Sequence, residues 1–546
     1  MTRKVASDHP KVAEINGGGQ RQMFRFGVKN MRRLKDVPPI ELKPITVLVG
    51  RNSSGKSTFL RTFPLIRQSI ITRTSSPILW YGDLVDFGQY SSVVSGGDER
   101  QKITLSFGLD QIYASTSNSF VIEPTWARRK NRIKKKVDID LIISGEANKT
   151  MLEGFSLAFD DEGCRFDVSI GHGGELSAIK MNTKDVFHLF SGVDVRFALG
   201  SLFPELVIRV KAEGAERYFW YNETNWASQL VEKHIRSHID KRIGASKINI
   251  FVSQLLDMDS FSNENIQHLE KNVGQGSFRK LLSDIRGKNN TRLREIISQI
   301  YETAVFLRSL PSVFGELRDL FSKSLYIGPV RARSERYYRY QDLSVSEIDP
   351  DGKNFPMFLN SLRQHQRDDF SNWVQRQFGY GVDVRSESGH ISILLKFGAD
   401  TSNIVDNGYG ISQVLPVLGQ IWWASRGKGT QVYPAQQSDG ATIVIEQPEL
   451  HLHPAHQALL ADAIVGERNA DTPDDARIKF IVETHSEALV NRLGQLVANG
   501  DVPHEDVQVL VFEDDKEQAV TTVRISPFDK DGVLQNWPFG FFQPAV

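Results

Sequence analysis

The chain has 546 residues, of which 66 are basic (Lys or Arg) and 66 acidic (Asp or Glu), and it contains one cysteine. This length can form more than one domain, and the balanced charge excludes recognition of a polyanion by overall charge, so any basic surface has to be local. The single cysteine, Cys164, excludes an internal disulfide framework. No apolar run reaches the roughly eighteen residues of a membrane span and the N-terminus does not resemble a signal peptide, so we expect a cytoplasmic protein with no membrane partner.

The first 22 residues are polar and glycine-containing, and we expect them to be disordered. The apolar, β-branched segment Ile45–Val49 then predicts a strand, and the segment from Phe59 onwards predicts the start of a helix. Between them the sequence matches G-x-x-x-x-G-K-[ST] from Gly50 to Ser57. A loop of this pattern between a strand and a helix is typical of nucleoside triphosphate binding, and this context argues against a chance match.

The loop residues suit phosphate chemistry. Gly50 and Gly55 let the backbone curl so that successive N–H groups point at phosphate oxygens, and the helix N-terminus adds partial positive charge. Lys56 would reach the β- and γ-phosphates, and the Ser57 hydroxyl would ligate Mg²⁺. The sequence therefore predicts a site for ATP with Mg²⁺.

The middle of the chain changes character twice. Short alternating runs between about 90 and 215 predict antiparallel sheet, as in Lys102–Phe107 and Val137–Ile143. From about 224 to 322 the pattern is helical, with one apolar face formed by Leu293, Ile296, Ile297, Ile300 and Ala304. This helical part is too short for a long coiled-coil arm, and we expect a compact cap.

A basic run lies within the sheet region. It consists of Arg128, Arg129, Lys130, Arg132, Lys134, Lys135 and Lys136, with Trp126 nearby. It could contact a nucleic-acid backbone with Trp126 stacking on a base, or it could be a solvated charged loop. A second candidate, Arg331–Tyr340, interleaves arginines with tyrosines, and its structural alternative is core tyrosines beside arginines that reach solvent.

Three further segments follow. Asp406–Gln413 is a glycine-rich turn whose Ser412 can cap the next helix. The buried-type strand Ala441–Glu446 ends in an acid, as expected where a carboxylate holds Mg²⁺ through water. Arg477–Glu483 is another strand, which is followed by Thr484-His485-Ser486. Because 390 residues separate Lys56 from Glu446, a large insertion divides the nucleotide-binding domain.

This order of motifs resembles the ABC-type ATPase heads of the SMC, RecF and OLD group. More narrowly, the segments that begin at Tyr326, Glu446, Thr484 and Asp529 resemble AAA-family ATPases with a C-terminal DUF3696 segment. That group includes Septu-type ATPases of bacterial anti-phage systems, some encoded beside retrons, and the chain is similar to these. The resemblance covers about residues 23–110 and 320–546. It implies an α/β fold, namely an ABC-type P-loop ATPase head with an inserted antiparallel sheet and a helical cap.

The resemblance also assigns roles to residues. Those enclosing the phosphates would be Asn52, Ser53, Ser54, Gly55, Lys56, Ser57 and Thr58. A signature formed by Gly408, Gly410, Ser412 and Gln413 would meet the γ-phosphate held by a second subunit, so that ATP lies between two heads. The metal would be held by Ser57, Gln89 and Glu446, although Gln89 could be merely solvated. His485 would be the switch histidine beside the γ-phosphate. His451 and His453 would lie in a dimer-contacting loop, with a surface turn or a zinc site with His456 as alternatives.

One departure from the family pattern concerns hydrolysis. Related heads usually carry Asp-Glu where this chain has Glu446-Gln447, followed by Pro448-Glu449. Gln447 cannot accept a proton, although its amide could orient water. Either Glu449 substitutes as the base or hydrolysis is slow. The residues expected to act in hydrolysis are Glu446, Gln447, Glu449 and His485.

The expected division of the chain is a disordered start (1–22), an N-terminal head lobe (23–110), a β-rich insertion (111–223), a helical cap (224–322), a C-terminal head lobe (323–500) and a DUF3696-like segment (501–546). The 61 residues after His485 leave no room for a Toprim nuclease domain, so we expect no intrinsic nuclease. The resemblance implies an ATPase that forms a dimer or higher oligomer and regulates a separate HNH-type nuclease. A reverse transcriptase or retron nucleic acid, DNA or RNA, could take part. The alternative is a RecF-like DNA repair clamp without an effector, whereas a kinase does not fit the signature.

Overall fold

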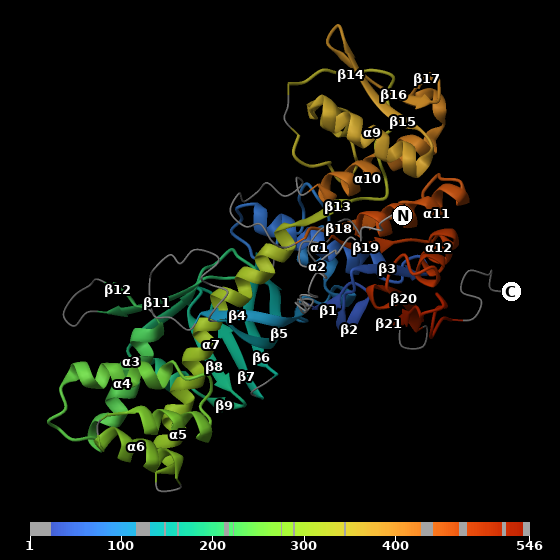
Figure 1. Cartoon of the computed structure of the whole chain (residues 1–546). Coiled ribbons are helices and arrows are strands. Elements are labelled where there is room, and N and C mark those ends of the chain that lie inside the picture. Colours follow the sequence, from blue (N-terminus) through green and yellow to red (C-terminus); the bar gives the residue numbers. More distant parts are fainter. Residues whose placement is uncertain are drawn as a thin grey trace, which may run out of the picture.

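The computed structural model describes residues 23–538 except for 116–131, 147–148, 161–162, 212–217, 222, 275, 288–289, 343–344, 427–439, 469–477 and 516–519. Within these residues the strands form four sheets. No described helix is long and apolar enough to cross a membrane. In Figure 1 the molecule is elongated, with the largest group of helices and the sheet that they cover at one end and a smaller helical group at the other.

A six-stranded sheet organises the first end, which we call the head. Its order is β13-β18-β19-β3-β20-β21, and every pair is parallel except the last. The carboxyl ends of the five parallel strands therefore share one edge. The bounds are β3 Ile45–Gly50, β13 Ser324–Ile327, β18 Thr442–Glu446, β19 Lys479–Glu483, β20 Val507–Asp515 and β21 Val520–Pro527.

Both faces of this sheet are buried, which explains why its strands are continuous apolar runs. Along β3, Leu48 faces a core shared with α1, whereas Val47 and Val49 face a second core shared with the helices of the opposite face. The helices of the head are α1 Lys56–Ile71, α10 Tyr409–Ser425, α11 Pro454–Arg468 and α12 Glu487–Ala498.

An eight-stranded antiparallel sheet adjoins the head, in the order β2-β1-β4-β5-β6-β7-β8-β9. It confirms the predicted antiparallel insertion, but it begins with β1 and β2, and residue 110 lies inside β4. The strands are β1 Phe24–Met31, β2 Leu34–Glu41, β4 Ile103–Ser115, β5 Arg132–Glu146, β6 Lys149–Phe159, β7 Cys164–Ile170, β8 Leu176–Met181 and β9 Lys184–Asp185. A three-stranded sheet follows, with β10 Val193–Phe197, β11 Leu206–Lys211 and β12 Tyr218–Tyr221.

The helical cap predicted between residues 224 and 322 is present. It contains α3 Glu223–Ile235, α4 Ala245–Leu256, α5 Asn263–Asn272, α6 Gly276–Arg286 and the first part of α7 Thr291–Ser322. The 32-residue helix α7 buries the predicted apolar face and runs from the cap to the head, where it packs on α1 (Figure 1). It leads directly into β13.

A smaller four-stranded sheet lies beyond α10, at the top of Figure 1. It consists of β14 Tyr338–Arg339, β15 Gly381–Glu387, β16 His390–Phe397 and β17 Asp400–Asn403. Helices α8 Phe355–Ser361 and α9 Gln364–Phe378 pack beside it, and α2 Tyr90–Val93 is a single turn in the N-terminal lobe.

Candidate functional site

The predicted strand, loop and helix are confirmed as β3, the loop 51–55 and α1. Gly50 is required by close packing, since an added Cβ would lie 2.5 Å from the Phe512 carbonyl oxygen. Gly55 has φ 94°, in the left-handed region that favours glycine. Lys56 is buried, and its Nζ donates to the carbonyl oxygens of Gly50 (3.1 Å) and Arg51 (2.8 Å). The lysine is therefore held against its own loop.

The other loop residues are divided between surface and interior. Asn52 and Ser53 are exposed, and Ser53 has φ 65°. Ser54 and Thr58 are buried, and the Ser54 hydroxyl has no hydrogen-bond partner among the described residues. An unpaired buried hydroxyl beside a phosphate-binding loop is a donor that a bound phosphate oxygen could satisfy.

Two glutamates lie side by side at the carboxyl edge of the head sheet. In the parallel register of β18 and β19, Glu446 is paired with Glu483, and β19 lies between β18 and β3. Ser57 Oγ donates to Glu483 Oε1 (2.8 Å), and Lys56 Nζ lies 3.9 Å from the same oxygen. Burial and then the charge of Glu446 raise the pKa of Glu483 to about 7.

Glu446 is occupied by other partners. Its two oxygens accept hydrogen bonds from Nε (2.6 Å) and Nη2 (2.7 Å) of Arg61, and Oε1 also accepts one from the Tyr326 hydroxyl (2.7 Å). Arg61 is four residues after Ser57, so α1 presents both on one face. The predicted metal role of Glu446 stays a prediction, because in this state its carboxylate is engaged by Arg61 and Tyr326.

The loop after β18 is tied to neighbouring segments. Gln447 has φ 44°, and its N–H donates to the Glu483 carbonyl (2.8 Å). Buried Arg331 donates from Nη2 to the Glu446 carbonyl (2.9 Å). Glu449 Oε1 accepts from the backbone N–H of His485 (2.7 Å), and burial raises the pKa of Glu449. The acidic loop and the His485 loop are thus joined through Glu449.

His485 and Gln89 differ in their relation to the phosphate loop. Burial and then the charge of Lys56 lower the pKa of His485, which favours the neutral imidazole. Gln89 is exposed, and its amide donates to Ser91 Oγ (2.9 Å). The metal role of Gln89 stays a prediction.

The signature lies at the N-terminus of α10. Ser412 and Gln413 are buried, with Ser412 Oγ donating to the Tyr409 carbonyl (2.7 Å) and Gln413 Nε2 to the Ala332 carbonyl (3.2 Å). Gly408 (φ 78°) and Tyr409 are exposed. An added Cβ on Gly410 would lie 2.4 Å from the carbonyl oxygen of residue 451, so the signature packs on the loop that follows β18.

The predicted histidine loop does not form a zinc site in the described part of the chain. His451 packs its ring on Tyr409, with the ring centroids 4.9 Å apart. His453 Nδ1 accepts from the N–H of Ala455 (3.2 Å), and His456 packs by Phe378. No group of three His, Cys, Asp or Glu residues suited to hold a metal occurs among the described residues.

The two candidate nucleic-acid segments fare differently. Arg331 is buried against the acidic loop, so it neither reaches solvent nor is available to nucleic acid, and Arg336 pairs with Asp406. Of the basic run, Arg128, Arg129 and Lys130 lie outside the described residues, whereas Arg132 begins β5 and Lys136 within it is exposed.

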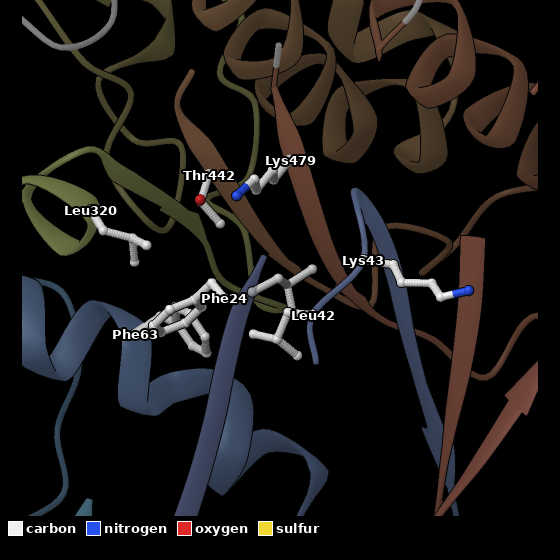
Figure 2. A pocket seen from close by; sticks show the side chains of 8 residues that line it. Phe24, Leu42, Lys43, Phe63, Leu320, Thr442 and Lys479 are labelled. Carbon is white, nitrogen blue, oxygen red and sulfur yellow. The ribbon is translucent and has the colours of Figure 1, made fainter. Parts of the chain in front are cut away.

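A small apolar cavity lies at the opposite edge of the head sheet (Figure 2). Thr442 and Lys479 are the first residues of β18 and β19, and Lys43 precedes β3, so they line the amino ends of the strands. Phe24 and Phe63 fill the other side. This cavity is therefore separate from the phosphate loop.

The sequence does not single out Glu483 or Arg61. The signal for Glu483 was available, because it is an acid at the end of an apolar strand, as Glu446 is. What the sequence could not supply is the strand order that places β19 next to β3.

The phosphate loop, the acids at the carboxyl ends of adjacent parallel strands and the α/β architecture define a P-loop ATPase fold. A model of the AAA ATPase domain matches residues 23–490, and the chain belongs to this family. A family of unknown function, DUF3696, matches residues 502–545.

The matches to solved structures are at low sequence identity. The chain is similar to the Smc head domain from Pyrococcus furiosus, solved with an extended coiled coil and bound to the C-terminal domain of ScpA, at 10% identity and TM-score 0.31 over 92% of this chain and 96% of that one. The SMC head domain from Thermotoga maritima matches at 10% identity and TM-score 0.31 over 93% and 99%. Likeness at this level supports no further conclusion. A comparison with curated proteins finds no match.

Proposed function

We propose that two copies of this chain close around ATP and Mg²⁺ and that the closed heads regulate a separate effector nuclease in bacterial anti-phage defence. The observation that carries the nucleotide part is the contact of Ser57 and Lys56 with Glu483, which gathers phosphate-binding and metal-binding groups at one edge of the sheet. Ser57 and Glu483 are placed where they would hold Mg²⁺, which would supply positive charge to neutralise the phosphates. Residues 52–58 would hold the phosphates, and the ring N–H of neutral His485 would donate a hydrogen bond to a γ-phosphate oxygen.

The donor set fits this metal. Mg²⁺ prefers hard oxygen ligands, and the edge offers the Ser57 hydroxyl and two carboxylates. One carboxylate oxygen, Glu483 Oε2, is buried without a hydrogen-bond partner among the described residues.

Closure of two heads would use the exposed N-terminus of α10. Tyr409 is 43% exposed and stands at the first position of the helix, whereas Ser412 is buried. Partial positive charge at a helix N-terminus attracts an anion such as the γ-phosphate held by the other head.

The test is nucleotide-dependent sizing by light scattering. Lys56→Ala should lose both ATP binding and dimer formation. Tyr409→Asp places a carboxylate where the partner's γ-phosphate would lie, so it should keep ATP binding and lose the ATP-dependent dimer. Asp is favourable in the first turn of an isolated helix, so the fold should persist. The control is Ile250→Asp, which changes an apolar residue that is 59% exposed on α4 of the cap. An unaltered dimer in Tyr409→Asp would rule out closure through this surface.

The effector part rests on the resemblance of the motifs to Septu-type ATPases. We expect a tagged chain, purified from its native host, to bring down an HNH-type nuclease or a reverse transcriptase with its nucleic acid. Mass spectrometry of the purified complex checks this. Recovery of DNA repair proteins without any nuclease or reverse transcriptase would instead favour the RecF-like clamp.

A further inference from the structure

The carboxylate in contact with the phosphate-loop serine belongs to β19. Ser57 Oγ donates to Glu483 Oε1 at 2.8 Å, and Lys56 Nζ lies 3.9 Å from that oxygen. The side chain of Glu483 is nearly inaccessible to solvent, and its second oxygen, Oε2, has no hydrogen-bond partner among the described residues. A buried carboxylate oxygen without a partner is costly, and a cation that arrives with the nucleotide would satisfy it.

Glu446 has no such unsatisfied oxygen. Arg61 binds it with both Nε and Nη2, at 2.6 and 2.7 Å, and the Tyr326 hydroxyl donates at 2.7 Å. Bidentate contacts between arginine and a carboxylate are among the strongest hydrogen-bonded pairs in proteins. To ligate a metal directly, Glu446 would have to exchange these charged donors for the cation.

The strand order also favours Glu483 over Glu446 as the metal ligand. β19 is hydrogen-bonded to β3, the strand that enters the phosphate loop, whereas β18 is one strand further away. Glu483 is therefore the nearer of two carboxylates that share one register position.

We propose that Glu483, with Ser57, supplies the protein ligands of the nucleotide's Mg²⁺, and that Glu446 is a positioning residue that fixes Arg61 and Tyr326. The inference rests on the proposed function, because the metal is expected to arrive with ATP. It transfers to β19 the metal role that the sequence suggests for β18. Direct ligation and ligation through one water are both included, since either requires the carboxylate charge.

Two matched variants test this division of roles. Glu483→Gln and Glu446→Gln make the same isosteric change at paired positions, and each removes one negative charge. Mn²⁺ binding is measured by electron paramagnetic resonance in the presence of ADP, and the affinity for fluorescent ADP is measured with Mg²⁺ and with EDTA.

In Glu483→Gln we expect Mn²⁺ affinity to fall about 10- to 100-fold, the range found when groups supporting a metal site are removed. ADP affinity in EDTA should not fall, because removal of a carboxylate beside the phosphates does not disfavour the metal-free nucleotide. Glu446→Gln should keep the parent's Mn²⁺ affinity.

A further variant guards against misfolding. Glu483→Asp keeps the charge and shortens the side chain, so it should bind Mn²⁺ more weakly than the parent and more tightly than Glu483→Gln. Full metal affinity in Glu483→Gln, or an equal loss in both glutamine variants, would overturn the inference while nucleotide binding stands. A parent protein without affinity for ADP in either buffer would overturn the proposed function, and this inference with it.

Discussion

Charges alternate along the carboxyl edge of the head sheet. Lys56 lies against Glu483 and Arg61 against Glu446, so each buried carboxylate has a cation from α1. Gln447, at the position where related heads carry a second acid, adds no further negative charge next to this pair. The backbone N–H of Gln447 donates to the Glu483 carbonyl, and its carbonyl accepts from Arg331. These two contacts fix the position of the Gln447 backbone, from which its side-chain amide extends. The site therefore combines ordered phosphate-binding groups with a position that cannot accept a proton.

This arrangement predicts slow hydrolysis. We expect phosphate release well below the roughly ten per second typical of enzymes, because Gln447 is no base. Glu449 is the substitute that the sequence suggests, and the raised pKa that burial gives it favours proton uptake. Glu449→Gln should slow phosphate release further while ATP binding persists, and Gln447→Glu should accelerate it.

A fluorescent phosphate sensor measures both variants, and ATP affinity measured in parallel separates binding from chemistry. Glu449 also accepts the N–H of His485, a contact that glutamine can retain through its amide oxygen. If Gln447→Glu is no faster and Glu449→Gln no slower than the parent, neither position limits hydrolysis.

At the scale of elements, the local patterns were the predictable part. β3, β18 and β19 are apolar runs because both faces of their sheet are buried, and α7 shows its apolar face in the spacing of Leu293, Ile297 and Ile300. The loop between β3 and α1 was also predictable, because its pattern of Gly50, Gly55, Lys56 and Ser57 is local in the sequence.

Long-range pairing was not predictable from one sequence. The antiparallel sheet joins β1 and β2 to strands beyond residue 110, because β4 pairs with β1 on one side and with β5 on the other. The contact of Arg331 with the acidic loop spans 115 residues of sequence. The pairing of Glu446 with Glu483 depends on β19 entering the sheet between β18 and β3. Residue identity predicted the phosphate loop and Glu446, whereas the strand order places Glu483 beside them.

On the scale of the whole molecule, α7 connects the cap to the head, where it reaches the amino ends of the sheet strands and leads into β13 (Figure 1). It ends at Ser322, and β13 then carries Tyr326, whose hydroxyl binds Glu446. Arg67 of α1 also donates to the Ser322 carbonyl (3.1 Å), so the end of the helix is fixed to the phosphate-loop helix. The cap and the candidate site are thus joined through covalent and hydrogen-bonded contacts.

Because the chain has no net charge, any binding of nucleic acid should depend on a local basic segment such as the run from Arg128 to Lys136. If the basic run contacts phosphates, replacing Lys134, Lys135 and Lys136 with Gln should weaken binding, because fewer counterions are released. The slope of log K against log salt concentration should flatten by about one unit for each phosphate that the variant no longer neutralises. The matched control replaces three exposed cap lysines, Lys241, Lys247 and Lys271, and changes the net charge equally. Fluorescence anisotropy with labelled DNA and RNA at several salt concentrations provides the slopes. An unchanged slope in the first triple variant, or the same flattening in both, would assign the run to a solvated loop, because only specific binding of phosphates by the run separates the two variants.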